Sequence, residues 1–298
     1  GSSVLISQYR GKGNTEAINR VMGIGMYAAG FIGLAFALIM GFFPLQFMSL
    51  FGDDLQVVAT AAQYARIVGW SYFFDSFVQV YNGVHRAMGN PQRGLYILAV
   101  SMTCNTFLNW VFIFGNLGAP RMGVEGAALA TLLARVLSCA IAVGGAVLDR
   151  EFKLDPVLLF RPGGEMVRRF VRFSTPVMCN ETFWGLGSSL FPTIMGHMEG
   201  SEEILAAYAI AGNITNLCTV GVFAIAGTAA ILVGQEIGSG RADQVRSLGA
   251  LLDVLAFLFG IAAGGAFLAL LHLLMIPVLY PLFKLTPSAG DICTMMLT

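Results

Sequence analysis

This sequence is organised around a repeat: residues 3–14 read SVLISQYRGKGN and residues 230–241 read AILVGQEIGSGR. Aligned without gaps, at a constant offset of 227 residues, the two stretches share four residues: Leu5 with Leu232, Gln8 with Gln235, Gly11 with Gly238 and Gly13 with Gly240. Each copy has an apolar helix end, a Gln, a G-x-G turn and a new helix that opens near an acidic residue. This long offset predicts a chain made of two similar halves.

The composition around the repeat is that of a membrane protein. Hydrophobic residues make up 56% of the 298 residues and charged residues only 11%, whereas a soluble domain carries about a quarter charged residues. Residues 21–51 and 254–283 contain no Asp, Glu, Lys or Arg, and runs of that length can span a bilayer. We therefore predict an all-α integral membrane protein embedded in a lipid bilayer. The net charge of zero provides no basic surface, so we expect no nucleic-acid partner.

The apolar segments and their turn residues predict a polytopic helical bundle. The expected helices are residues 1–9, 16–43, 55–88, 93–115, 122–148, 173–198, 203–237 and 242–275, and a last one that begins at about 288. Residues 149–172 are the most charged stretch and form the expected cytoplasmic linker. The predicted organisation is a partial N-terminal lobe at 1–148 and a partial C-terminal lobe at 173–298, with about eight full or partial spans.

Lysine and arginine gather in alternate loops. Thirteen lie on one side: Arg10, Lys12, Arg20, Arg86, Arg93, Arg150, Lys153, Arg161, Arg168, Arg169, Arg172, Arg241 and Arg246. Only Arg121 and Lys284 lie on the other side. Because basic loops stay in the cytoplasm, both G-x-G turns are predicted to face it, which agrees with six spans between them. The repeat predicts a parent of roughly 450 residues with two six-helix lobes. This chain would then lack the first one to two and the last two to three helices.

Several motifs, in order along the chain, resemble the multidrug and toxic compound extrusion (MATE) transporters. They are QYRGKGN after the first helix, HRAMGNPQRGLYI at 85–97, NTFLNWVFIFGNLGAPRMGVEGAALAT at 105–131, TPVMCNETFWGLG at 175–187 and VGQEIGSGR at 233–241. The resemblance implies two six-helix lobes around a central cavity. It also implies export of organic, often cationic, compounds in exchange for Na⁺ or H⁺ by alternating access.

Glu181 is a candidate ion-coupling or substrate-binding residue, because a charge inside a membrane span is costly and usually functional. Asn180 precedes it, and Trp184 follows three residues later on nearly the same helix face. A carboxylate beside an indole suits a cation or a titrating proton. The resemblance implies that an acid in this helix takes part in ion coupling or drug binding. The alternative is a Glu that hydrogen-bonds a neighbouring helix.

Asp75 is the second candidate, near the middle of helix 55–88. It belongs to a polar stripe at helical spacing: Ser71, Asp75, Gln79, Asn82 and Arg86. A second stripe on helix 93–115 holds Ser101, Asn105 and Asn109. Together these oxygens could form a Na⁺ or proton site, or they could hydrogen-bond between helices. If Asp75 pairs with Arg135, the acid is a structural ion pair instead.

Asp253 is a weaker candidate on helix 242–275, since its aligned position in the first half is Met26 and the acid is no part of the repeat.

No histidines have the spacing of metal ligands, so we expect no metal and no cofactor other than the coupling ion. An enzyme such as a prenyl transferase would need a paired acidic motif. The pair Asp53-Asp54 is followed by Leu-Gln-Val and lies on the outer side, so we expect no catalysis.

The sequence therefore predicts a secondary antiporter for small organic, cationic compounds, monomeric and multi-pass in the plasma membrane. The alternative is a lipid-linked oligosaccharide flippase of the same superfamily. A flippase cavity should be strongly cationic to hold pyrophosphate, whereas the acids inside these helices balance or outnumber the arginines.

Overall fold

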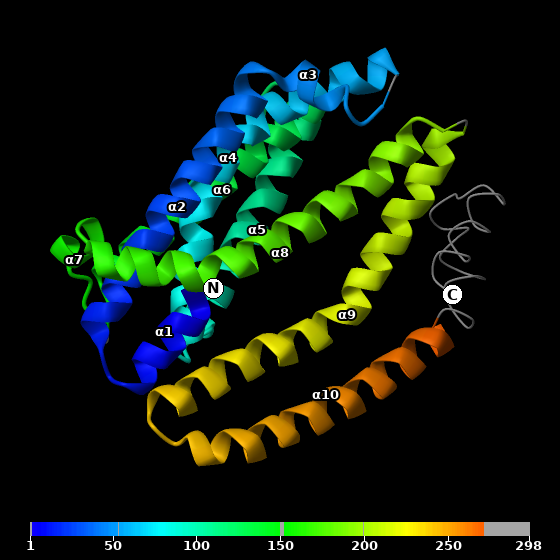
Figure 1. Cartoon of the computed structure of the whole chain (residues 1–298). Helices are drawn as coiled ribbons and strands as arrows, with labels where there is room; N and C mark the ends of the chain where they lie inside the picture. Colours follow the sequence, from blue (N-terminus) through cyan, green and yellow to red (C-terminus); the bar gives the residue numbers. More distant parts are fainter. Residues whose placement is uncertain (1, 53, 150–151, 199, 271–298) are drawn as a thin grey trace. The chain divides into compact units, whose positions relative to one another are not determined.

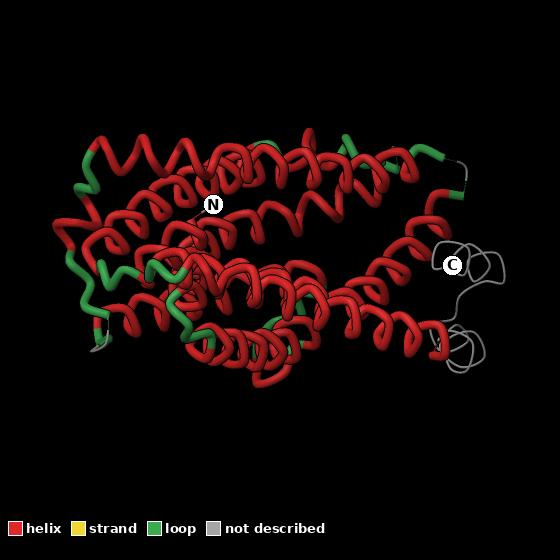
Figure 2. The backbone as a smooth tube through the Cα atoms, turned by 60° about the horizontal axis from the view of Figure 1, so that its bottom comes forward, coloured by secondary structure: helices red, strands yellow, loops and turns green. Residues whose placement is uncertain are grey.

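The computed structural model describes residues 2–52, 54–149, 152–198 and 200–270, and the regular elements within these ranges are helices (Figures 1 and 2). The chain forms two compact units, Gly1–Thr182 and Phe183–Thr298, and each is considered by itself. The all-helical prediction is confirmed. The expected end of helix 242–275, the proline-rich turn after it and the helix from 288 lie outside the described residues.

Eight α-helices and one 3-10 turn lie in the first unit or begin there. They are α1 Ser2–Gly11, α2 Thr15–Phe42, α3 Pro44–Met48, α4 Leu55–Ala87, α5 Gln92–Phe114, η1 Asn116–Gly118, α6 Val124–Val147 and α7 Pro156–Phe160, followed by α8 Gly164–Gly196, which continues into the second unit. Helices α2, α4, α5 and α6 match their predicted ranges to within two residues. The short helices α3 and α7 begin at prolines in the first helical turn, where proline is well tolerated.

Five described segments are long and apolar enough to cross a membrane: α2, α5, α6, residues 219–238 and residues 243–267. Helices α4 and α8 are longer, at 33 residues each, and carry more polar side chains. Between Ser71 and Arg86, one face of α4 carries the polar stripe, and the opposite face carries the aromatic residues Phe73, Phe77 and Tyr81. This division within one helix determines where the cavities of the first unit lie.

Helix α4 is the central helix of the first unit, packing against α1, α2, α3, α5 and α6. The core lies where α1, α2 and α4 meet and includes Leu5, Ile18, Met22 and Val84. Small residues permit close approach: a Cβ on Gly33 of α2 would lie 2.9 Å from a backbone oxygen of α4. Membrane helices commonly pack in this way, because lipid supplies no hydrophobic force that drives helices together.

The turns in both copies of the repeat have the same backbone structure. Gly13 and Gly240 both have positive φ, at 68° and 81°, which glycine adopts without strain. Two N–H to C=O hydrogen bonds close each turn. In the first copy Gly13 donates to Arg10 at 3.0 Å and Asn14 to Tyr9 at 2.9 Å; in the second Gly240 donates to Ile237 at 3.2 Å and Arg241 to Glu236 at 3.1 Å. This Schellman pattern shows that the sequence repeat is also a structural repeat.

Side chains complete these turns differently. Asn14 caps α2 by accepting a hydrogen bond from the Ala17 N–H at 2.9 Å. In the second copy the Arg241 guanidinium donates to both carboxylate oxygens of Glu236, at 2.6 and 2.9 Å. These hydrogen bonds raise the pKa of Arg241, and the Glu236 carboxylate balances its charge.

Helix α8 begins at Gly164, nine residues before the predicted start at 173. A positive φ of 82° at Gly163 ends the linker, and Glu165 lies in the first turn, where an acid is favoured by the helix dipole. Three arginines expected in the linker therefore lie on α8. One of them, Arg169, lies 5.6 Å from the Tyr9 ring centroid and links α8 to α1.

The segment between α6 and α8 packs on the first unit. The Asn19 amide donates to the Lys153 carbonyl, and its oxygen accepts from the Asp155 N–H, both at 3.2 Å. A Cβ on Gly23 of α2 would lie 2.0 Å from the Leu159 carbonyl oxygen, so only glycine lets α7 approach this closely. The segment is held by specific contacts along its length.

The second unit contains α9, Ser201–Gly238, and α10, Ala242–Leu270, which pack against each other through the second repeat turn. Gly221 of α9 faces α10, because a Cβ there would lie 2.2 Å from the Phe259 ring.

Candidate functional site

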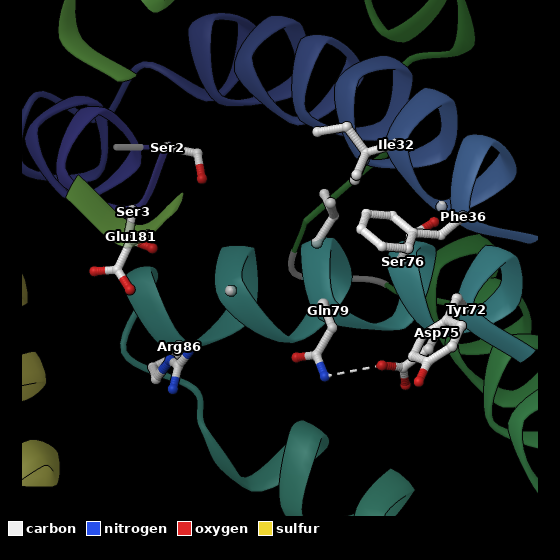
Figure 3. A pocket seen from close by; sticks show the side chains of 14 residues that line it. Ser2, Ser3, Ile32, Phe36, Tyr72, Asp75, Ser76, Gln79, Arg86 and Glu181 are labelled. Carbon is white, nitrogen blue, oxygen red and sulfur yellow. Dashed lines mark hydrogen bonds between the residues drawn. The ribbon is translucent and has the colours of Figure 1, made fainter. Parts of the chain in front are cut away.

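The polar stripe of α4 forms a hydrogen-bonded surface within the first unit. Asp75 lies mid-helix, and its Oδ2 accepts a hydrogen bond from Gln79 Nε2 at 3.2 Å (Figure 3). Residues four apart lie on one face of a helix, so Gln79 orients the carboxylate. Two cavities adjoin this surface, and both are lined by Asp75, Gln79 and Arg86.

The larger of these, which we call the polar cavity, has a volume of about 880 Å³ and lies among α1, α2, α4 and α8. Asp75 and Glu181, the two main candidate acids, both line it. Figure 3 shows Glu181 at one end beside Ser3 and Asp75 toward the other end. The fold therefore brings the two predicted acids, which lie on different helices, to one cavity.

The smaller cavity, about 380 Å³, lies among α4, α5 and α6. Besides the three shared residues, its polar lining comprises Asn82, Ser101, Arg135 and Ser138. Asn82 Oδ1 is buried and has no hydrogen-bond partner among the described residues. A buried acceptor without a partner costs free energy unless a ligand or water satisfies it.

Asp75 is paired with Arg135, the alternative that the sequence left open. Arg135 Nη1 lies 2.9 Å from Asp75 Oδ1, with the side chains 39% and 23% exposed. The same Oδ1 has no hydrogen bond of acceptable geometry, so the contact is a charge pair with poor alignment. The ion pair balances the charge of the acid within the bundle, and Glu181 has no such counter-ion among the described residues. The role of Asp75 in transport stays a prediction.

Asn105 and Asn109 form a hydrogen-bonded chain between α5 and α6. Asn109 donates to Asn105 Oδ1 at 3.0 Å, and Asn105 donates to Thr131 Oγ1 at 3.3 Å. The chain leaves Asn109 Oδ1 buried without a partner among the described residues. The chain therefore carries three side-chain oxygens, the kind of ligand that a hard cation prefers. Thr131 lies within a sequence motif quoted above, but only the fold brings it beside Asn105.

The remaining predicted residues lie apart from these cavities. Asn180 and Trp184 flank Glu181 on α8; all three residues are exposed, and Trp184 belongs to the second unit. Asp253 lies on α10 in the second unit and is exposed. Their predicted roles remain predictions.

Asp54 has a structural role, because its carboxylate caps α4 by accepting from the Gln56 and Val57 N–H groups at 2.8 and 3.1 Å. In the described ranges, no three His, Cys, Asp or Glu side chains cluster as a metal site.

A buried charged cluster escaped the sequence analysis. Asp149 is 2% exposed, and its carboxylate accepts from Arg93 Nη1 and Nη2 at 2.5 and 3.0 Å. His85 Nε2 lies 3.3 Å from the same carboxylate, and the His85 ring stacks 4.1 Å from the Tyr81 ring. The three residues come from α4, α5 and the end of α6, so no local pattern could have grouped them.

The chain matches a known family over most of its length. The MatE family model matches residues 1–111 and 176–287. A curated relative, "Probable multidrug resistance protein NorM" of Thermotoga maritima, is 25% identical over 89% of this chain and 56% of its own length. Another, "Probable multidrug resistance protein YoeA" of Bacillus subtilis, is 24% identical over 83% of this chain and 54% of its own length. The chain thus spans little more than half the length of these relatives.

Solved structures share the fold. One described as "Crystal structure of eukaryotic MATE transporter AtDTX14" matches with a TM-score of 0.81 at 16% identity, over 99% of this chain and 64% of that one. An outward-facing MATE family transporter matches with a TM-score of 0.75 at 23% identity, over 100% of this chain and 65% of that one. These matches, together with the apolar helices, confirm a polytopic helical membrane protein.

Proposed function

The chain belongs to the MatE family, and from that premise we propose that the whole protein is a secondary antiporter. It would export organic, cationic compounds across the plasma membrane in exchange for Na⁺ or H⁺ by alternating access. It would act as a monomer and need no cofactor besides the coupling ion. The curated relatives are named multidrug resistance proteins, which supports a multidrug substrate range.

One observation carries this proposal: Asp75 and Glu181 line the same polar cavity of about 880 Å³. A volume in the range of about 300–1,000 Å³ suits a small organic ligand. Acids at membrane depth attract cations, because little water is present to screen them. Glu181 is our main candidate for binding the cation or the exchanged proton, since Asp75 has Arg135 as a counter-ion.

The oxygens of Asn105, Asn109 and Thr131 are the candidate site for a coupling ion. Asn109 Oδ1 is buried without a partner in the described structure, and a bound Na⁺ or a water would satisfy it. Sodium coupling would use these neutral oxygens directly. Proton coupling would need a titrating group, for which Glu181 is the candidate.

The alternative, a lipid-linked oligosaccharide flippase, fits the cavity less well. The charged residues that line the polar cavity are Asp75, Glu181 and Arg86, so acids outnumber arginines there. A pyrophosphate would be repelled by this arrangement and favoured by the reverse one.

The test is ethidium export by the whole protein, as its gene encodes it, in inverted membrane vesicles with an imposed ΔpH or ΔNa⁺. Glu181→Gln is expected to reduce the rate of gradient-driven export at least about tenfold. This corresponds to an activation free energy of export that is higher by about 1.4 kcal/mol. Glu165→Gln is the matched control, since it makes the same change on an exposed residue of α8 outside the cavity. Asp75→Asn tests the second acid.

Two outcomes would oppose the proposal. Unchanged coupled export in both Glu181→Gln and Asp75→Asn would show that these acids are not the site. No ethidium movement under either gradient, together with translocation of a pyrophosphate-linked oligosaccharide lipid, would support the flippase.

A further inference from the structure

The face of α4 opposite the polar stripe borders a cavity of about 720 Å³, which we call the aromatic cavity. Its aromatic wall on α4 comprises Phe73, Phe74, Phe77 and Tyr81. The other walls come from Met26 of α2, from Cys139, Ala142, Val143, Ala146 and Val147 of α6, and from the segment that includes α7. None of the proposed transport residues lines this cavity.

The aromatic wall is ordered by ring contacts. The Phe73 ring lies 5.1 Å from the Phe77 ring at 87° and 5.5 Å from the Phe74 ring at 76°, edge-to-face arrangements that aromatic pairs favour. Opposite them, Ala142 and Ala146 are buried and too small to fill the space. The cavity is therefore built from large rings on one helix and small side chains on another.

One end of the cavity carries charge. Asp149 and Lys153 lie there, and the Asp149 carboxylate is already bound by Arg93. Lys153 is exposed and has no ion-pair partner among the described residues. The lining at this end therefore has a free cationic group beside an acid whose charge is compensated.

The length of the aromatic wall along α4 is close to the thickness of the hydrocarbon layer in one leaflet of a bilayer. From Phe73 to Tyr81, eight steps along α4, the helix rises about 12 Å, and half of the hydrocarbon core is about 15 Å. Two walls come from α2 and α6, which are long and apolar enough to span the membrane. Lys153 lies in the segment that the distribution of basic residues predicts to be cytoplasmic.

We propose that the aromatic cavity binds an acyl chain of an anionic phospholipid of the cytoplasmic leaflet, with the Lys153 ammonium holding the lipid phosphate. A lipid is the occupant because the cavity lies among membrane-spanning helices. An anionic headgroup is favoured because Lys153 has no ion-pair partner among the described residues. An organic cation would be repelled by Lys153, so this site is distinct from the polar cavity.

Photo-crosslinking tests the proposal without needing transport. The whole protein is reconstituted in phosphatidylcholine vesicles with a trace of phosphatidylglycerol that carries a diazirine on its acyl chain, illuminated, digested and mapped by mass spectrometry. Crosslinks are expected within residues 73–81 of α4 and 139–147 of α6. Unlabelled phosphatidylglycerol should compete about fivefold better than added phosphatidylcholine, as expected for about 1 kcal/mol from one lysine.

Two variants make the test specific. Lys153→Gln should abolish the fivefold preference, whereas Lys12→Gln, on another exposed lysine of the same predicted side, should retain it. Val143→Trp fills the cavity from a residue that is 55% exposed, so it should reduce the crosslinks about fivefold while the protein stays folded. The proposal is overturned if crosslinks spread evenly over lipid-facing helices such as α5. It is also overturned if phosphatidylcholine competes equally, or if Lys153→Gln behaves like Lys12→Gln.

Discussion

The two faces of α4 differ in chemistry, since one borders a polar cavity and the other an aromatic cavity. One face presents Asp75, Gln79 and Arg86 to the polar cavity, and the other presents Phe73, Phe77 and Tyr81 to the aromatic cavity. Neighbours in sequence, such as Phe74 and Asp75, belong to different environments because each helical residue is rotated by about 100°. A single helix can therefore serve a substrate on one side and lipid on the other.

The largest expected effect is at the charged end of the aromatic face. Asp149→Asn should lower the free energy of unfolding by about 3 kcal/mol, because the buried carboxylate contacts both Arg93 and the buried His85, and the variant removes the anion from both contacts. Unfolding in detergent by guanidinium, followed by circular dichroism, measures the change. The control is Asp54→Asn at the exposed helix cap, which should remain within about 0.5 kcal/mol of wild type since Asn caps as well as Asp. Equal losses in both variants would show that Asp149 is not a buried anchor.

The ion pair on the polar face should contribute less to the free energy of unfolding. Arg135→Gln is expected to cost about 2 kcal/mol, less than a fully buried pair because both side chains are partly exposed. The double variant Asp75→Asn with Arg135→Gln should recover at least half of that loss, since neither charge is then left alone. A double-mutant cycle of unfolding free energies measures the coupling. Strictly additive losses would mean that the 2.9 Å contact contributes nothing.

The third prediction concerns the unsatisfied amide on the polar face. Asn82→Leu should raise the free energy of unfolding by about 1 kcal/mol, because it removes a buried acceptor that has no partner. The matched variant is Asn105→Leu, which removes an amide with two hydrogen bonds and should lower stability by a similar amount. If Asn82→Leu is also destabilising, its oxygen has a partner in the membrane, and ethidium export by the variant would test whether that partner is the substrate or ion.

The smallest expected change in stability concerns Gly83, which lines the polar cavity. A Cβ on Gly83 meets no atom within 4 Å, whereas a Cβ on Gly69 of the same helix would lie 2.4 Å from Met40 Cβ. Gly83→Ala should therefore raise stability by about 0.5 kcal/mol through the lower backbone entropy of the unfolded chain. Gly69→Ala should lower stability, because α2 must shift. A melting temperature that falls in Gly83→Ala, as it should in Gly69→Ala, would argue against an open cavity beside Gly83.

The sequence predicted the helices and turns well because these depend on local interactions. Long apolar runs located α2, α4, α5 and α6, and the glycines of the repeat located turns with positive φ. The start of α8 was wrong because charged residues such as Arg168 and Arg169 were interpreted as a linker. Those residues are favourable in a helix, and Arg169 gains a contact with Tyr9 from a distant helix, which no local pattern reveals.

The candidate site was predictable only residue by residue. Asp75, Gln79 and Glu181 were selected because polar groups inside apolar helices are costly. Their shared cavity could not be predicted, since Glu181 lies 94 residues after Ala87, the end of α4, in the sequence. The indole of Trp184 was expected beside Glu181; both residues lie on α8, and the role of Trp184 stays a prediction.

By itself, the sequence determined that this is a helical membrane protein with a repeated turn, because hydrophobic length and glycine conformation act over a few residues. Only the tertiary structure decided which charges pair: Asp75 with Arg135, and Asp149 with Arg93 and His85. It also decided that the two faces of α4 border separate cavities. Pairing and cavities depend on which helices become neighbours, and that is set by packing between segments far apart in the chain.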